Sequence, residues 1–239
     1  MKKLFLFALS SLLLNAQSLT YAIKAPLFGS VGSVSIHYQT TSKSYKIDAS
    51  LATSGFAKKV TGNRRASYTS KGFVSNNLYK SKLFYEDTSD KNKRREHKYI
   101  FDYKKRKIYK ETKAWKDNKL IKNTKRTLEY FTYNDFFTAY HNIVAQLKDK
   151  PAGTYQMQVA GMEKYGGYLK IVIPPLSQQK KEAKMLGAKG SWVFHLKTKR
   201  KILGSKSGEL IFAVGNDGIA KVVRVLDVPF VSHMDAVLR

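Results

Sequence analysis

The chain has 239 residues and is 43% hydrophobic, which is enough for one large domain with a substantial core. Its 44 Lys and Arg residues outnumber 17 Asp and Glu residues, and the resulting net charge of +27 either attracts polyanions or serves only solubility. The chain contains no cysteine, which excludes a disulfide framework, a Cys-ligated zinc site and a thiol nucleophile.

The N-terminus has the pattern of a secretory signal peptide. Residues 1–3 are a short basic region, residues 4–14 are an apolar run too short to span a bilayer, and Ala16 is the small residue that a signal peptidase prefers. No cysteine follows the apolar run, so a lipid anchor of the bacterial lipoprotein type is excluded. We expect a signal peptide over residues 1–16, a single antiparallel β-rich domain over residues 17–239, and a periplasmic location.

Alternating apolar and polar residues predict strands along most of the remaining chain. The period-2 pattern predicts them at residues 33–38, 45–51, 65–71, 78–86, 99–103, 155–159, 169–173, 192–196 and 230–238. Two polar stretches, residues 86–98 and 113–125, are predicted to be connections. A short basic helix is expected at residues 178–186.

The best-defined local structure is a β-hairpin over residues 208–226, closed by a two-residue turn at Asp217 and Gly218. In that register Phe212 faces Val223 and Leu210 faces Val225. One face of the hairpin is almost entirely apolar, so we expect it to lie against other parts of the protein.

One long helix is predicted over residues 133–148. Its apolar residues recur at helical spacing, and they are Phe136, Phe137, Tyr140, Ile143, Val144 and Leu147. Thr132 or Asn134 is expected to cap its start, and Pro151 and Gly153 to enforce its end. We expect the apolar stripe to pack on the sheet, with Phe137, Tyr140 and Val144 buried. The predicted fold is therefore mainly β, a strongly curved antiparallel sheet or open barrel packed on one long α-helix.

No catalytic or metal-binding motif is present. The five histidines have no metal-ligand spacing, and there is no nucleophile elbow, P-loop or dinucleotide-binding fingerprint. His141 is expected to be an exposed or hydrogen-bonded helix residue. We therefore expect a non-enzymatic protein without a cofactor or a metal ion.

Two basic clusters are the candidate binding residues, and we expect them to contact an anionic lipid surface. They flank one predicted strand, and they are Lys91, Lys93, Arg94, Arg95 and Lys98, and then Lys104, Lys105, Arg106 and Lys107. The alternative is a solvated surface without a preferred partner. Nucleic acid is not expected, because the alternation places the aromatic residues on the inner face of the same strands.

The order of these features resembles the exported bacterial family catalogued as domain of unknown function 3108. The residues that carry the resemblance are strand patterns and turns at residues 21–38, 45–56, 99–103 and 134–136, and residues 228–230 after the closing hairpin. Val231 departs from the family pattern, which has glycine there. The resemblance implies a periplasmic, mostly antiparallel β protein with no established catalytic residues. Its curved sheet is similar in architecture to periplasmic lipoprotein carriers.

Three functions remain open on the sequence. The first is binding of an amphiphile or lipid-linked molecule of the cell envelope, with at most a peripheral membrane association. The second is an envelope structural or interaction protein that docks on acidic partners through a basic face. The third is an unrecognised hydrolase. A deep apolar cavity would favour the first, a filled core with a basic patch the second, and a polar cleft with convergent titratable groups the third.

The signal-peptide pattern predicts that the mature protein starts at Gln17. N-terminal sequencing of the protein isolated from the cell envelope checks this position. Protein that still begins at Met1 would contradict the prediction.

Overall fold

The computed structural model describes residues 15–55, 57–58, 62–163, 166–198 and 205–239. Most of the predicted signal peptide lies outside the described residues. Fourteen strands and two helices are described, and they are β1 (Asn15–Ala25), β2 (Gly29–Thr40), β3 (Ser44–Thr53), β4 (Arg65–Ser75), β5 (Leu78–Asp90), β6 (Lys93–Asp102), β7 (Lys107–Lys116), β8 (Lys119–Thr127), α2 (Phe136–Leu147), β9 (Gly153–Gln158), β10 (Tyr168–Ile173), α3 (Leu176–Met185), β11 (Trp192–Lys197), β12 (Glu209–Val214), β13 (Ala220–Val228) and β14 (Ser232–Leu238).

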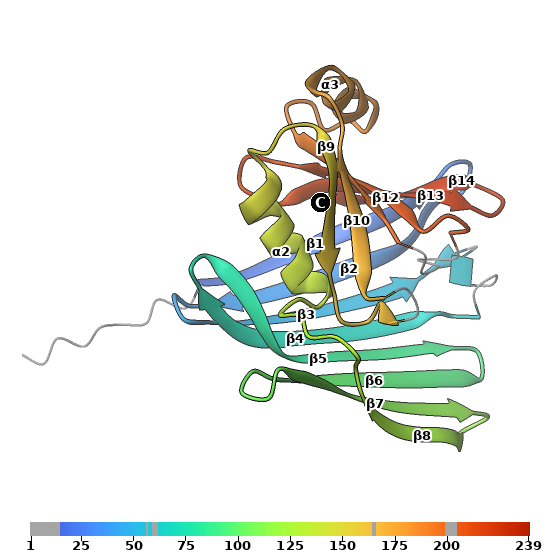
Figure 1. Cartoon of the computed structure of the whole chain (residues 1–239). Helices are drawn as coiled ribbons and strands as arrows, with labels where there is room; N and C mark the ends of the chain where they lie inside the picture. The colour runs from blue at the N-terminus through green and yellow to red at the C-terminus, as the bar shows by residue number, and fades with distance from the viewer. Residues whose placement is uncertain (1–14, 56, 59–61, 164–165, 199–204) are drawn as a thin grey trace, which may run out of the picture.

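All fourteen strands belong to one antiparallel sheet, which curves around α2 and is not closed (Figure 1). The strand order is β8-β7-β6-β5-β4-β3-β2-β1-β14-β13-β12-β11-β10-β9, so β8 and β9 are the edges. The first and last strands, β1 and β14, pair from Tyr21 with Leu238 to Lys24 with Asp235, and this pairing joins the two halves of the chain. The prediction of a mainly β, open antiparallel sheet is confirmed.

The prediction of one long helix is wrong, because the chain forms two short ones. Helix α2 has 12 residues and begins at Phe136 rather than at Tyr133. Helix α3 has 10 residues, close to the predicted bounds, and covers the sheet face opposite to α2 through Ala183 and Leu186. Within the part of the chain that the structure describes, neither helix has the length and hydrophobicity needed to cross a bilayer.

The register of the predicted hairpin is confirmed, but its turn is not. Phe212 pairs with Val223 and Leu210 with Val225. The turn covers five residues between β12 and β13, and Gly218 adopts a positive φ of 75° whereas Asp217 does not. A register shift after Ala213 accommodates the longer connection.

The two stretches predicted as connections are mostly strand. Residues 86–98 contain the end of β5, a tight turn at Lys91 and the start of β6, and residues 113–125 contain most of β8. All nine residues of β8 are exposed, and its sequence does not alternate between apolar and polar residues. The period-2 pattern fails here because neither face of the strand is buried.

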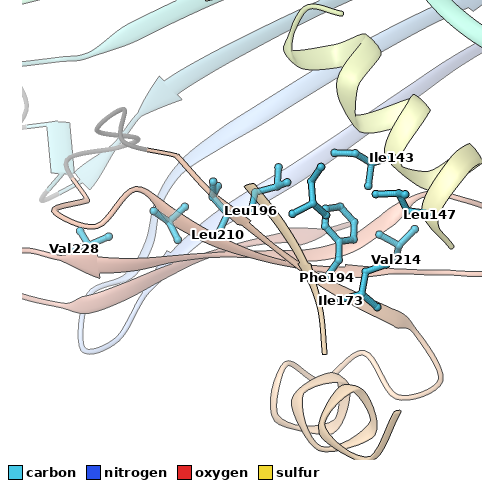
Figure 2. Close-up of a cluster of buried hydrophobic side chains, with 10 residues drawn as sticks. Ile143, Leu147, Ile173, Phe194, Leu196, Leu210, Val214 and Val228 are labelled. Atoms are coloured by element: carbon cyan, nitrogen blue, oxygen red, sulfur yellow. The ribbon is translucent and has the colours of Figure 1, made fainter. Parts of the chain in front are cut away.

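Helix α2 packs its C-terminal half against strands β10 to β13 (Figure 2). Ile143 and Leu147 point from the helix toward the sheet, next to Phe194 and Val214. The N-terminal half contacts a second apolar cluster around Phe84, on the other part of the sheet. The predicted burial of Phe137, Tyr140 and Val144 is only partial, because these side chains line cavities.

This difference in burial predicts different stability effects along one helix. Ile143 is fully buried, so Ile143→Ala should lower the free energy of unfolding by about 2–5 kcal/mol. Phe137→Ala should cost less than the roughly 3 kcal/mol expected at a fully buried Phe, because the cavity already borders its ring. Urea unfolding of both variants measures the difference, and an unchanged midpoint for Ile143→Ala would show that α2 does not pack as described.

Candidate ligand cavity

The start of α2 is fixed by a buried carboxylate. Asp135 is fully buried and accepts hydrogen bonds from the backbone N–H groups of Phe137 at 2.8 Å and Thr138 at 3.1 Å. The hydroxyl of Ser70, on β4, donates to the second carboxylate oxygen at 2.6 Å. Burial raises the pKa of Asp135, while these donors favour its charged form. The helix is therefore capped and attached to the sheet by the same side chain.

Neither predicted capping residue caps the helix. Thr132 and Asn134 instead donate to the carbonyl oxygen of Gln158, at 2.6 Å and 3.1 Å. They connect the segment before α2 to β9, at the far edge of the sheet. Asp135 directly precedes the apolar stripe, which is the sequence signal that identifies it as the cap.

Asn142 attaches the middle of α2 to β5 in the manner of a β-ladder. Its amide nitrogen donates to the carbonyl of Tyr79 at 2.9 Å, and its amide oxygen accepts from the N–H of Tyr79 at 2.9 Å. The same amide nitrogen donates to the side chain of Asn134 at 2.7 Å. Asn142 is fully buried, so these hydrogen bonds replace the ones that its side chain would make with water in the unfolded chain.

Between α2 and the sheet lies an apolar cavity of about 310 Å³. Its walls come from α2 and from strands β1, β2 and β10 to β14. Among the described residues that line it, all except His141 and Thr198 are aliphatic, aromatic or Met. Its volume lies at the lower end of the range of small-molecule sites. We call this space the apolar cavity.

A second cavity, of about 330 Å³, adjoins the apolar cavity and has more polar walls. We call it the polar cavity. The shared lining residues are Tyr21, Tyr38, Tyr140, His141 and Ala220. Gln17, Thr40 and the exposed Asp217 line only the polar cavity.

Two tyrosines hold the β12–β13 turn against the polar cavity. The hydroxyl of Tyr140 donates to the carbonyl of Gly218 at 2.8 Å, and the hydroxyl of Tyr21 donates to the carbonyl of Ala220 at 2.9 Å. Burial raises the pKa of Tyr21 to about 12 and raises that of Tyr140 further. Both rings therefore stay protonated and neutral in the physiological range.

His141 occupies the junction of the two cavities. Its ring stacks on Tyr79 with centroids 4.4 Å apart and meets the edge of Tyr38 at 5.4 Å. Its Nε2 atom is buried and has no hydrogen-bond partner in the described protein. Burial lowers the pKa of His141 to about 4, so the imidazole is neutral at neutral pH. The expectation of an exposed or hydrogen-bonded histidine is wrong, because helix α2 turns this face toward the cavities.

The two predicted basic clusters lie on and around β6: the first runs from the turn before this strand into the strand, and the second lies in the turn after it. Lys91 lies in the turn before β6, and Lys104, Lys105 and Arg106 lie in the turn before β7, which begins at Lys107. Their binding to an anionic surface stays a prediction.

The basic residues on β6 itself point to both faces of the sheet. Lys93 and Arg95 share the face of the buried Tyr99, whereas Arg94 and Lys98 lie on the opposite face. The charge of Arg94 is already engaged, because its guanidinium lies 2.8 Å from Asp87 and 2.6 Å from Glu96. The predicted binding residues therefore do not form one continuous patch.

Titratable groups elsewhere contact one another away from these cavities. His195 contacts Glu182 of α3 at 2.8 Å and Glu209 at 3.3 Å, which ties α3 to the outer face of the sheet. Lys110 pairs with Glu163 at 3.0 Å, and burial lowers the pKa of that lysine. Among the described residues, no three His, Cys, Asp or Glu side chains are arranged to hold a metal ion.

The fold and the cavities together define a mainly β protein whose open sheet encloses a space of ligand size beside a helix. No protein-family model matches the chain, and no curated protein does. The chain is similar to a solved structure, the crystal structure of a beta-barrel-like protein of Domain of Unknown Function DUF1849 from Brucella abortus. The TM-score is 0.55 and the sequence identity 11%, over 93% of this chain and 94% of that chain.

At this identity the likeness shows the fold alone. It supports a barrel-like β architecture shared with a domain of unknown function. Membership of the family of domain of unknown function 3108 is not shown, because no family model matches and the structural neighbour carries a different family name.

The buried imidazole predicts a specific pH dependence of stability. In the unfolded chain His141 takes up a proton near pH 6.5, whereas in the folded protein it does so only near pH 4. The unfolded state therefore binds more protons between these values, and stability should fall as the pH drops through this window, by about 3 kcal/mol at most.

The variant His141→Phe keeps a ring on Tyr79 but does not titrate. Urea unfolding from pH 7 to pH 4 should show a smaller loss of stability in this variant than in the wild type. Equal losses in both proteins would mean that His141 is not buried as a neutral base. Asp135 is common to both proteins, so its titration cancels in the comparison.

Proposed function

We propose that this protein is a non-enzymatic, exported periplasmic protein that binds an amphiphile or lipid-linked molecule of the cell envelope. The observation that carries the proposal is the apolar cavity beside α2, joined to the polar cavity by five shared residues. An amphiphile has the same division into an apolar and a polar part. A core filled without a cavity would instead favour a purely structural or interaction protein.

The cavity walls suggest how such a ligand would lie. Its hydrocarbon part would occupy the apolar cavity, where each buried methylene contributes about 0.8 kcal/mol. Its polar group would reach the junction at His141 and Tyr38. A hydroxyl or amide donor of the ligand would hydrogen-bond to Nε2 of His141, which is buried and has no partner within the described protein.

The positive charge of the protein favours a ligand that is anionic or that is held in an anionic membrane. The net charge is +27, and the residues that we propose meet anionic headgroups are Lys91 to Lys98 and Lys104 to Lys107. These two clusters lie toward opposite ends of β6, so one of them meets a flat membrane at a time. Each Lys or Arg near an anionic surface contributes about 1 kcal/mol, and the attraction decays over about 8 Å at physiological salt.

A cavity-filling variant tests the binding site. Ala236 lines the apolar cavity between Ile23 of β1 and Val223 of β13, so Ala236→Phe should place a ring in the space that the ligand needs. We expect the affinity for a dansylated undecanoic acid probe to fall at least about tenfold, because the ring displaces several methylenes of the probe. Fluorescence titration measures the affinity, and urea unfolding confirms that the variant folds.

The matched control is Ala52→Phe, the same change at an exposed position of β3, which should leave the affinity unchanged. Val34→Phe is a second cavity-filling variant in case Ala236→Phe does not fold. Unchanged probe affinity in both cavity variants would remove the cavity as the binding site. Native mass spectrometry of the protein purified from its own envelope identifies the bound molecule by mass.

A second candidate function is an envelope interaction protein that docks on acidic partners through a basic face. The observation that favours it is the exposed strand β8, in which Lys119, Lys122, Lys125 and Arg126 are four of the nine residues. In that case the probe would not bind and the purified protein would carry an acidic protein or polymer in place of a small molecule.

A further inference from the structure

Two turns at one end of the sheet expose large apolar side chains. Leu27, between β1 and β2, is 98% exposed, and Phe230, between β13 and β14, is 87% exposed. No other described large hydrophobic side chain is as exposed as these two. In Figure 1 both turns lie at the right-hand end of the sheet.

Both residues also have backbone conformations that such side chains rarely adopt. The φ angle is 68° at Leu27 and 72° at Phe230. Gly or Asn is the usual residue at such positions, and a bulky apolar residue there is strained. Neither side chain packs against the rest of the protein, so neither residue contributes to the stability of the fold in return for this strain.

The two turns are neighbours in space. Strand β1 pairs with β14, and Lys24 lies opposite Asp235 near the ends that carry the turns. Val231, which follows Phe230, packs with Ala25 and Val31 in one apolar cluster. Leu27 and Phe230 therefore project from a common base, and we call them the apolar tips.

Exposed lysines lie on loops at the same end of the sheet as the apolar tips. Lys206 lies beside the β13–β14 connection, because its backbone N–H donates to the carbonyl of Asp227 at 2.9 Å. Lys91 lies beside the β3–β4 loop, because its N–H donates to Gly62 at 2.6 Å, and that loop reaches β2 through a bond from Ser54 to Val31 at 2.9 Å.

Lys24 and Lys58 are exposed on the same end, in β1 and in the β3–β4 loop. The four lysines named here stand beside three acidic residues of the same end, Asp90, Asp227 and Asp235. Apolar tips and cations at one end of the protein match the two regions of an anionic membrane surface. The apolar side chains fit the acyl chains, and the cations fit the charged headgroups above them.

We propose that this end of the protein docks on anionic phospholipid membranes, with Leu27 and Phe230 inserted and the lysines of the same end at the headgroups. The cluster beneath the tips contains Ile23 and contacts Met234, and both of these residues also line the apolar cavity. Docking would therefore place one end of that cavity at the membrane surface. The docking itself does not depend on what the cavity binds.

Asparagine variants separate docking from folding. Leu27→Asn and Phe230→Asn remove the apolar tips but place a residue that tolerates positive φ, so the double variant should fold at least as stably as the wild type. Its binding to vesicles of phosphatidylglycerol and phosphatidylcholine should weaken about tenfold or more in co-sedimentation. Leu176→Asn, which removes an exposed Leu from α3 on the outer face, is the matched control and should bind as the wild type does.

Insertion is measured directly with Phe230→Trp. Its fluorescence should be quenched by brominated acyl chains in anionic vesicles, whereas the native Trp115 and Trp192 of the wild type give the background. The wild type should also release from the vesicles as salt is raised, and should not bind vesicles of phosphatidylcholine alone.

Undiminished binding by the double asparagine variant, or no quenching of Phe230→Trp above the background, would overturn the proposal. Equal binding to anionic and zwitterionic vesicles would overturn it as well. The Ala236→Phe variant distinguishes the two proposals, because it should lose the probe yet still bind anionic vesicles.

Discussion

A fourteen-stranded sheet that curves around a twelve-residue helix has more concave surface than the helix can cover. Ile143 and Leu147 pack against the sheet on one side of α2, and Phe136 and Phe137 contact it on the other. The remaining apolar surface of β1, β2 and β13 faces a cavity. The cavity beside α2 thus exists because the concave face of the sheet is larger than the surface that the helix covers.

The helix holds its place through polar bonds that are themselves buried. Asp135 and Asn142 connect α2 to β4 and β5, and Thr132 connects the preceding segment to β9. Buried polar bonds have defined geometry, so they position the helix without filling the space around it. This arrangement leaves the half-buried aromatic residues of α2 available as cavity walls.

The sequence predicts best where one face of a strand is buried. The register of Phe212 with Val223 follows from alternation, and so do the positions of most strands along the chain. Strand β8 is missed because both of its faces are solvated, and His141 is misplaced because periodicity cannot distinguish a helix face that packs from one that lines a cavity. The neighbouring Leu27 and Phe230 are more than two hundred residues apart in the chain, so only the pairing of β1 with β14 shows that they share a surface.

The exposed edge strand β8 has a consequence for self-association. An open sheet presents unpaired backbone groups at its edges, and such an edge is a template for the edge of another copy. Two copies of β8 in antiparallel pairing would bring eight Lys and Arg side chains together along one pair of strands. Repulsion among these charges would oppose such pairing, and a polyanion that neutralises them would lower this barrier to polymerisation.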